Sequence, residues 1–311
     1  MKIAYRFLAF IALIVCVVFL INAVQSEEVN ETFESKFIND YNIYALTLPE
    51  SMDFAGETVP LSDPSIRERM DRELLVNTYW QSNGLLMFKR ANKYFPVIEP
   101  ILKEYGVPDD FKYLALIESG LQNVVSPAGA RGIWQIMPST AREYGLEVND
   151  NVDERYHLVK ATVAACKYLL ESKERFGDWT KAAAAYNAGN NGIERRLEEQ
   201  KVTGYYDLLL GDETERYMFR ILAWKEIMSN PKKYGFHFRD KDLYEMVPSY
   251  TVEVDTAVTD LAQFAKDFGI NYKILKIHNP WLREPKLNNK SRKQYFIELP
   301  KVGHYKTENN H

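Results

Sequence analysis

The chain is poor in cysteine: its 311 residues include only Cys16 and Cys166. Because Cys16 lies in an N-terminal segment expected to be removed, Cys166 would be left alone in the mature chain, and an intramolecular disulfide is excluded. Cys166 falls in a helical apolar pattern with Val159, Val163 and Leu170. This pattern predicts a core residue rather than a nucleophile.

An excess of basic charge is also lacking, since 39 Lys and Arg stand against 43 Asp and Glu, a net charge of -4. No global positive field therefore argues for a nucleic-acid partner. The 5 His residues show no spacing typical of metal ligands, so we expect neither a metal nor a cofactor. What is plentiful is apolar material, 46% of the chain, which is enough for a sizeable core and a second small module.

Long apolar runs are scarce, and the clearest one covers residues 7–21. Lys2 and Arg6 precede it, and Val24 and Ser26 supply small side chains at a spacing suited to cleavage after Ser26. Together these features predict a signal peptide over residues 1–26, and hence export. The run is short for a membrane span, and a retained anchor is the alternative.

The rest of the chain divides into a helical region and a smaller mixed region. Residues 27–62 predict a polar N-terminal arm, 63–231 an all-α domain without strand patterns, and 232–248 a linker. Residues 249–301 predict a second module, followed by a tail over 302–311. Within the all-α domain, a helix is expected to begin at Asp63-Pro64, with Ile66, Met70 and Tyr79 on one face. Further helices are expected at about 85–94, 96–105, 108–119, 138–144, 156–176, 180–188 and 213–229.

The second module is expected to have a strand at 250–254, helical segments near 257–268 and 272–278, and a strand at 294–299. This βααβ order resembles the LysM peptidoglycan-binding module. The resemblance is carried by Asp255, Thr256, Leu261, Phe264, Ala265, Gly269, Asn279, Pro280 and residues 297–300. Val254 stands where that module usually has Gly before the Asp-Thr pair. Glycan binding and a structural or docking role, with envelope proteins as partners, are therefore both open.

Glu118 is the main candidate for acid catalysis. Phe111, Leu114, Ala115 and Glu118 recur on one helical face, and Gly120 is a predicted C-cap. Glu118 thus continues an apolar stripe in the last turn, where desolvation and the negative end of the helix dipole raise a carboxyl pKa. A carboxylic acid that stays protonated near neutral pH can protonate a glycosidic oxygen. The alternative is a surface Glu at a frayed helix end.

A small-residue loop follows Glu118. Residues 126–132 supply two glycines, which let the backbone approach a ligand closely. Gln135 can both donate and accept hydrogen bonds, which suits an acetamido group. Trp134 is more typical of packing than of ligand contact. The Asp and Glu residues between 140 and 180 are expected to face solvent, so none of them is predicted to be a second catalytic carboxylate.

Two later segments add candidate polar groups. The small-residue helix end at 182–189 presents Tyr186 and Asn187, whose hydroxyl and amide could position a sugar N-acetyl carbonyl. The alternative is a helix terminus with a buried tyrosine. Glu213 and Tyr217 open a further helix, in which Tyr217 could be purely a core residue.

Four motifs occur in order over about a hundred residues: Glu-Ser at 118–119, Gly-Ile-Trp-Gln at 132–135, Ala-Tyr-Asn-Ala-Gly at 185–189 and Glu-Thr-x-x-Tyr at 213–217. In this combination the chain resembles the lysozyme-like lytic transglycosylases of glycoside hydrolase family 23. It is most similar to the membrane-bound murein transglycosylase D type, which also carries C-terminal LysM modules. The resemblance covers residues 80–230 closely and 250–300 loosely.

The resemblance implies a mainly α fold, with a lysozyme-like all-α catalytic domain and a small C-terminal βααβ module. It implies Glu118 as the sole catalytic carboxylate, acting as acid and then base to form 1,6-anhydro-MurNAc ends without water. The residues implied to bind substrate are Ser126, Gln135, Met137, Tyr186, Asn187, Glu213 and Tyr217.

The same resemblance implies peptidoglycan glycan strands as the partner, no metal or cofactor, and a monomer. It places the protein in the periplasm or cell envelope of a Gram-negative-type bacterium. Two rival functions are a goose-type lysozyme-like hydrolase and a non-catalytic peptidoglycan-binding protein.

Overall fold

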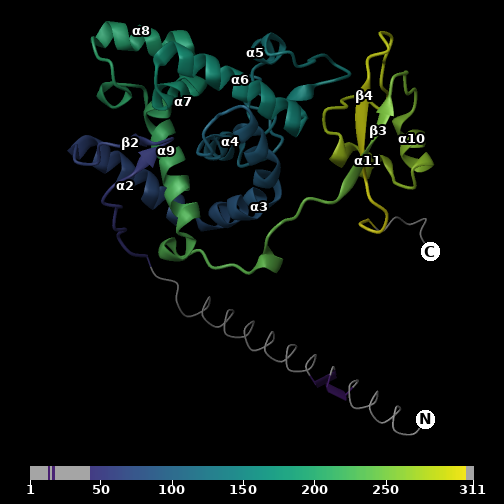
Figure 1. The fold of residues 1–311 in the computed structure, drawn as a ribbon, viewed down its shortest axis with the longest axis horizontal. Helices are drawn as coiled ribbons and strands as arrows, with labels where there is room; N and C mark the ends of the chain where they lie inside the picture. The colour runs from purple at the N-terminus through teal and green to yellow at the C-terminus, as the bar shows by residue number, and fades with distance from the viewer. Residues whose placement is uncertain (1–12, 15, 18–42, 306–311) are drawn as a thin grey trace. The chain divides into compact units, whose positions relative to one another are not determined.

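The computed structural model describes residues 13, 14, 16, 17 and 43–305 (Figure 1). The chain divides into two units, residues 1–45 and 46–311, and all that follows concerns the second. The predicted signal peptide lies almost wholly outside the described residues, as does most of the predicted arm. In the part of the chain that is described, no helix is both long and apolar enough to cross a membrane.

Residues 46–62, the last part of the predicted arm, pack against the helical domain. A short antiparallel hairpin joins β1 (Asp53–Phe54) to β2 (Glu57–Thr58). Phe54 is fully buried in the core of the helical domain. The carboxylate of Glu57 accepts hydrogen bonds from the backbone N–H groups of Trp179 and Thr180, at 2.6 and 2.8 Å. It therefore satisfies donors at the start of a helix far along the chain.

The helical domain is all α, as predicted. Its helices are α2 (Pro64–Tyr79), α3 (Gln81–Glu104), α4 (Phe111–Ser119), α5 (Pro138–Glu143), α6 (Leu158–Phe176), α7 (Trp179–Ala188), α8 (Asn190–Gln200) and α9 (Asp212–Ser229). Short 3-10 turns are η1 (Glu154–Tyr156), η2 (Tyr205–Asp207), η3 (Pro231–Tyr234) and η4 (Asp240–Asp242). Helix α9 packs against α2, α4 and α7, which brings segments far apart in sequence to one place.

One helix prediction was wrong, and one helix was not predicted. The separate helices expected at 85–94 and 96–105 are one helix, α3, with Pro96 and Pro100 inside it. A proline removes one backbone donor, but burial of the apolar face of α3 keeps the helix continuous. Helix α8 was not predicted, because its polar sequence holds only two large apolar side chains, Ile193 and Leu197, which are too few to establish a helical pattern.

The C-terminal module has the predicted βααβ order: β3 (Ser249–Val254), α10 (Leu261–Asp267), α11 (Tyr272–His278) and β4 (Tyr295–Pro300). The two strands are antiparallel, with Val252 opposite Ile297. Asp260 and Asn271 accept hydrogen bonds from backbone N–H groups at the starts of α10 and α11, so both helices are capped. The buried core of the module also includes Val152 and Tyr156, which come from the helical domain.

Candidate active site

Helix α4 places Glu118 in its last turn, as the sequence predicts. Gly120 ends the helix in the left-handed conformation, at φ 60°, and its N–H donates to the carbonyl of Leu116 at 2.8 Å. Nearly all of α4 is buried, including the flanking Ile117 and Ser119, whereas Glu118 is half-buried. The carboxyl group is therefore mostly removed from water but not sealed off.

Burial raises the pKa of Glu118 from 4.5 to about 7. Two groups act against burial: the Tyr217 hydroxyl, which donates to Glu118 Oε1, and the positive charge of Arg220. The charge of Glu213 raises the pKa further. Near neutral pH the carboxyl group is thus divided between its acid and its base form, which suits a group that must give and take a proton.

The raised pKa predicts a pH-dependent stability for Glu118→Gln. Between about pH 4.5 and pH 7 the folded protein holds a proton that the unfolded chain has lost, so wild-type stability falls as pH rises. The glutamine side chain does not titrate, so the variant does not lose stability in this way as pH rises. We expect the variant to be about 1–3 kcal/mol more stable than wild type at pH 8, and equally stable at pH 4. Urea denaturation at the two pH values measures this, and an identical difference at both would contradict it.

Helix α9 supplies the groups that face the carboxyl. Tyr217 is 2% exposed, and its own pKa lies well above the ordinary value because of burial and the neighbouring Glu118. The hydroxyl therefore keeps its proton and stays a donor. One turn later, Arg220 Nη2 donates to the carbonyl of Ile117 at 2.9 Å, which holds its charge beside the end of α4.

Replacement of Tyr217 by Phe should raise the pKa of Glu118, because the hydrogen bond from the hydroxyl stabilises the carboxylate. The expected result is a titration of the Glu118 carboxyl at higher pH, measured by carbon NMR of labelled protein. Tyr186→Phe is the matched control, since the Tyr186 hydroxyl donates to the Trp134 carbonyl instead. An unchanged titration in Tyr217→Phe would show that the hydroxyl does not stabilise the charged form.

The loop after Glu118 is tied to α4 through Ser119, whose Oγ donates to the carbonyl of Ile133 at 2.7 Å. Gln135 has a left-handed backbone, at φ 48°. Its Nε2 donates to the carbonyls of Val124 and Gly132, at 3.1 and 2.7 Å. Because the loop uses both amide protons, the amide oxygen of Gln135 is the atom that this side chain can offer to a ligand.

Ser126 shapes the same loop. Its Oγ accepts a hydrogen bond from the N–H of Ala130 at 3.0 Å. Met137 is 39% exposed and lies at the N-cap of α5. Gly132 was interpreted as a position for close approach of a ligand, but its close neighbour is the carbonyl oxygen of Arg155, 2.0 Å from where a Cβ would lie.

Tyr186 and Asn187 connect the end of α7 to the rest of the site. The Tyr186 hydroxyl donates to the Trp134 carbonyl at 2.8 Å, and the charge of Glu118 contributes to the high pKa of Tyr186. Asn187 Oδ1 accepts from Thr214 Oγ1 at 2.9 Å, which joins α7 to the start of α9. The structure thus places three of the predicted residues near Glu118. Tyr217 donates a hydrogen bond to its carboxyl group, whereas Tyr186 and the exposed Glu213 interact with it electrostatically.

Sequence reasoning missed several residues at the site. Ser119 and Arg220 hold the end of α4, and Asp153 and Arg155 hold the loop. Asp153 and Glu154 were expected to face solvent, but both are buried. They tolerate burial because basic side chains, among them Arg155 and Lys160, pair with them. The signal available for Arg220 was its position one turn after Tyr217 on α9.

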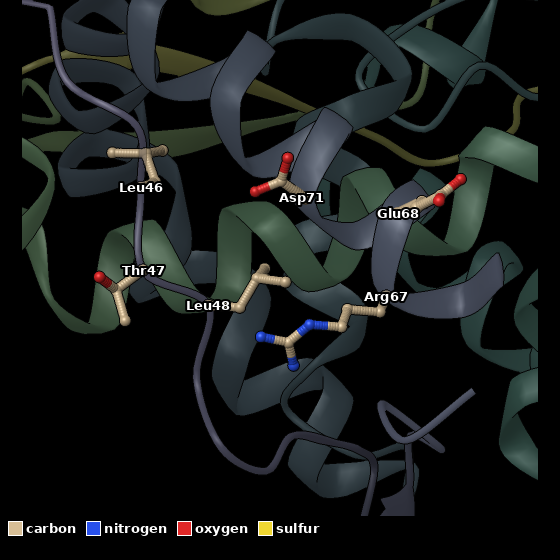
Figure 2. A pocket seen from close by; sticks show the side chains of 6 residues that line it. All are labelled: Leu46, Thr47, Leu48, Arg67, Glu68 and Asp71. Carbon is tan, nitrogen blue, oxygen red and sulfur yellow. The ribbon is translucent and has the colours of Figure 1, made fainter. Parts of the chain in front are cut away.

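The part of the chain described here also has a hollow of about 460 Å³ away from these residues. Figure 2 shows residues 46–48 running past α2, with Arg67, Glu68 and Asp71 projecting from the helix beside them. None of the predicted site residues lines this hollow. It therefore gives no support to a glycan site there.

Residues 95–208 match the family model of the transglycosylase SLT domain. Residues 250–303 match that of the soluble lytic transglycosylase C-terminal LysM-like domain. The chain therefore contains a transglycosylase SLT domain followed by a LysM-like domain. The first match includes Glu118, Gln135, Tyr186 and Asn187.

Two curated relatives are the membrane-bound lytic murein transglycosylase D proteins of two Escherichia coli strains. The chain is 32% identical to each over 235 residues, which is 73% of this chain and 50% of the relative. The chain thus spans about half the length of the curated relatives that it matches.

Proposed function

We propose that this protein is a peptidoglycan lytic transglycosylase, a carbon–oxygen lyase that acts on glycan strands. The observation that carries the proposal is the Glu118 carboxyl, with a pKa of about 7 and a hydrogen bond from Tyr217, inside a transglycosylase SLT domain. The relatives' names specify murein as their substrate, which supports the same substrate class for this chain.

In the first step, Glu118 donates its proton to the oxygen that links MurNAc to GlcNAc, and the bond from that oxygen to C1 breaks. Because Tyr217 donates to Oε1, the proton is carried by Oε2. The acetamido oxygen of the same MurNAc stabilises the positive charge that develops at C1.

In the second step, the Glu118 carboxylate removes the proton from the C6 hydroxyl of MurNAc, and this oxygen attacks C1. Tyr217 and Arg220 stabilise the carboxylate in the interval between the two proton transfers. The product is a 1,6-anhydro end. The tethered hydroxyl is favoured over water because its effective concentration is much higher.

The proposed substrate-binding residues lie on the loop after α4, at the end of α7 and at the start of α9. They are Ser126, Gln135, Met137, Tyr186, Asn187, Glu213 and Tyr217. We propose that they bind the glycan on either side of the cleaved bond. The protein would act as a monomer in the cell envelope, after export directed by residues 1–26.

Mass spectrometry of muropeptides tests the proposal, with purified protein and Glu118→Gln each incubated with isolated peptidoglycan. Anhydro-MurNAc products that vanish in the variant are expected. Reducing ends that contain one added water would instead indicate a goose-type lysozyme-like hydrolase, for which Glu213 is the first candidate for a second carboxylate. Binding without products would indicate a non-catalytic peptidoglycan-binding protein.

A further inference from the structure

The LysM-like module packs against residues 147–157 of the helical domain, which lie between α5 and α6 and which we call the connecting loop. Val152 pairs with Leu282 of the module as an antiparallel β-bridge. The Asp153 N–H donates to the carbonyl of Trp281, and the Arg283 N–H donates to the carbonyl of Asn151, each at 2.9 Å. The connecting loop therefore continues the module's backbone hydrogen bonding.

The side chain of Asn151 is fully used by the module. Its Nδ2 donates to Glu284 Oε2 at 2.9 Å and to the Lys286 carbonyl at 2.7 Å. Its Oδ1 accepts from the Asn288 N–H at 2.8 Å. A buried amide with both protons and its oxygen bonded fixes one orientation of the two partners.

Charged and aromatic groups surround this backbone contact. Lys293 Nζ lies 2.6 Å from Glu147 and 3.4 Å from the buried Glu154. The Arg283 guanidinium stacks over the Tyr156 ring, 4.2 Å from its centroid. Because Tyr156 also belongs to the module's apolar core, the contact combines apolar burial with ion pairs.

The connecting loop forms hydrogen bonds with a second segment, residues 124–137, which we call the active-site loop. Asp153 and Arg155 form a buried pair, 1% and 3% exposed, with Arg155 Nη2 2.8 Å from Asp153 Oδ2. The other end of the guanidinium, Nη1, donates to the carbonyls of Gly129 and Ile136, at 3.0 and 3.2 Å. Arg155 therefore holds the two sides of the active-site loop together.

The active-site loop in turn contacts α4, the helix that carries Glu118, and α7. The Ile133 carbonyl accepts from Ser119, the neighbour of Glu118, and the Trp134 carbonyl accepts from Tyr186. Direct contacts thus run without a break from the module to Asp153 and Arg155, and on to the surroundings of Glu118.

We propose that the docked LysM-like module acts as a brace for the active-site loop, and that Arg155 is the positioning residue that transmits it. The effect on cleavage rests on the proposed function, whereas the brace itself does not. A module that only anchored the enzyme to the wall would need no such contacts with the connecting loop. A module that holds the active-site loop in place affects cleavage even of glycans too short to reach beyond the active site.

Hydrogen exchange in the full chain tests the brace without using activity. Lys293→Glu places three acidic groups together, and its side chain is 41% exposed, so the domains should stay folded. We expect amides of the active-site loop to exchange about tenfold faster. The double variant with Glu147→Lys should restore slow exchange, and Lys290→Glu, an exposed lysine of the same module loop, should leave it unchanged. Faster exchange confined to the module and the connecting loop would overturn the proposal.

Cleavage assays give a second readout. On a soluble peptidoglycan fragment of two disaccharides, Lys293→Glu should lower kcat about tenfold with little change in KM, because misplaced groups slow the chemistry. Loss of activity on insoluble peptidoglycan alone would mean wall anchoring and would overturn the brace. If wild type cleaves neither substrate, the proposed function fails, and the exchange experiment still decides whether the module holds the loop.

Discussion

Glu118→Gln is expected to lower the rate of glycan cleavage by about a thousandfold or more, while glycan binding stays nearly unchanged. The amide has the shape of the carboxyl group, and its oxygen can still accept from Tyr217. It cannot give a proton to the glycosidic oxygen or take one from the C6 hydroxyl. Single-turnover cleavage of a defined glycan, with binding measured by calorimetry, separates the two effects.

The matched control for this loss is Glu174→Gln, which makes the same chemical change at an exposed position on α6. It should cleave at the wild-type rate. The wild-type rate itself should fall as pH rises through about 7, because Glu118 then enters the reaction without its proton. Retention of a tenth or more of the wild-type rate in Glu118→Gln would remove Glu118 from the mechanism.

Gly132→Ala is expected to destabilise the fold by about 3 kcal/mol or more. Gly132 has φ 81°, and a Cβ there would lie 2.0 Å from the Arg155 carbonyl oxygen and 2.9 Å from its carbon. The clash is with backbone, so it cannot be relieved by a change of rotamer. The connecting loop or the active-site loop must move.

Gly129→Ala is the control for the backbone conformation alone. Gly129 belongs to the same loop and has φ 88°, but a Cβ there meets nothing within 4 Å. Its expected cost is about 1–2 kcal/mol, that of a left-handed residue. Urea denaturation of both variants tests the comparison, and equal losses would show that the contact with Arg155 does not matter.

The features that sequence predicted best are local ones. The position of Glu118 on an apolar stripe and the cap at Gly120 follow from spacing within one helix, and the direction of the Glu118 pKa follows from them. Helix α8 escaped prediction because its sequence is polar nearly all round, and its place depends on tertiary packing.

The long-range parts of the site could not be predicted in this way. Whether Asp153 faces water or Arg155 is decided by the fold, because neither residue belongs to a periodic pattern. The proximity of Tyr217 to Glu118, 99 positions apart, rests on the packing of α9 against α4. Only the resemblance to a known family pointed to Tyr217, and the one signal for Arg220 was its place one turn after Tyr217 on the same helix.

The burial of Val152 and Tyr156 in the module's core limits how the two segments can change during evolution. A substitution that enlarges or shrinks the module's core must be matched in the connecting loop, so these two stretches have to change together over evolutionary time. The module is therefore a poor candidate for transfer as an independent cassette. A chimera should combine cleanly only when residues 147–157 travel with the C-terminal module.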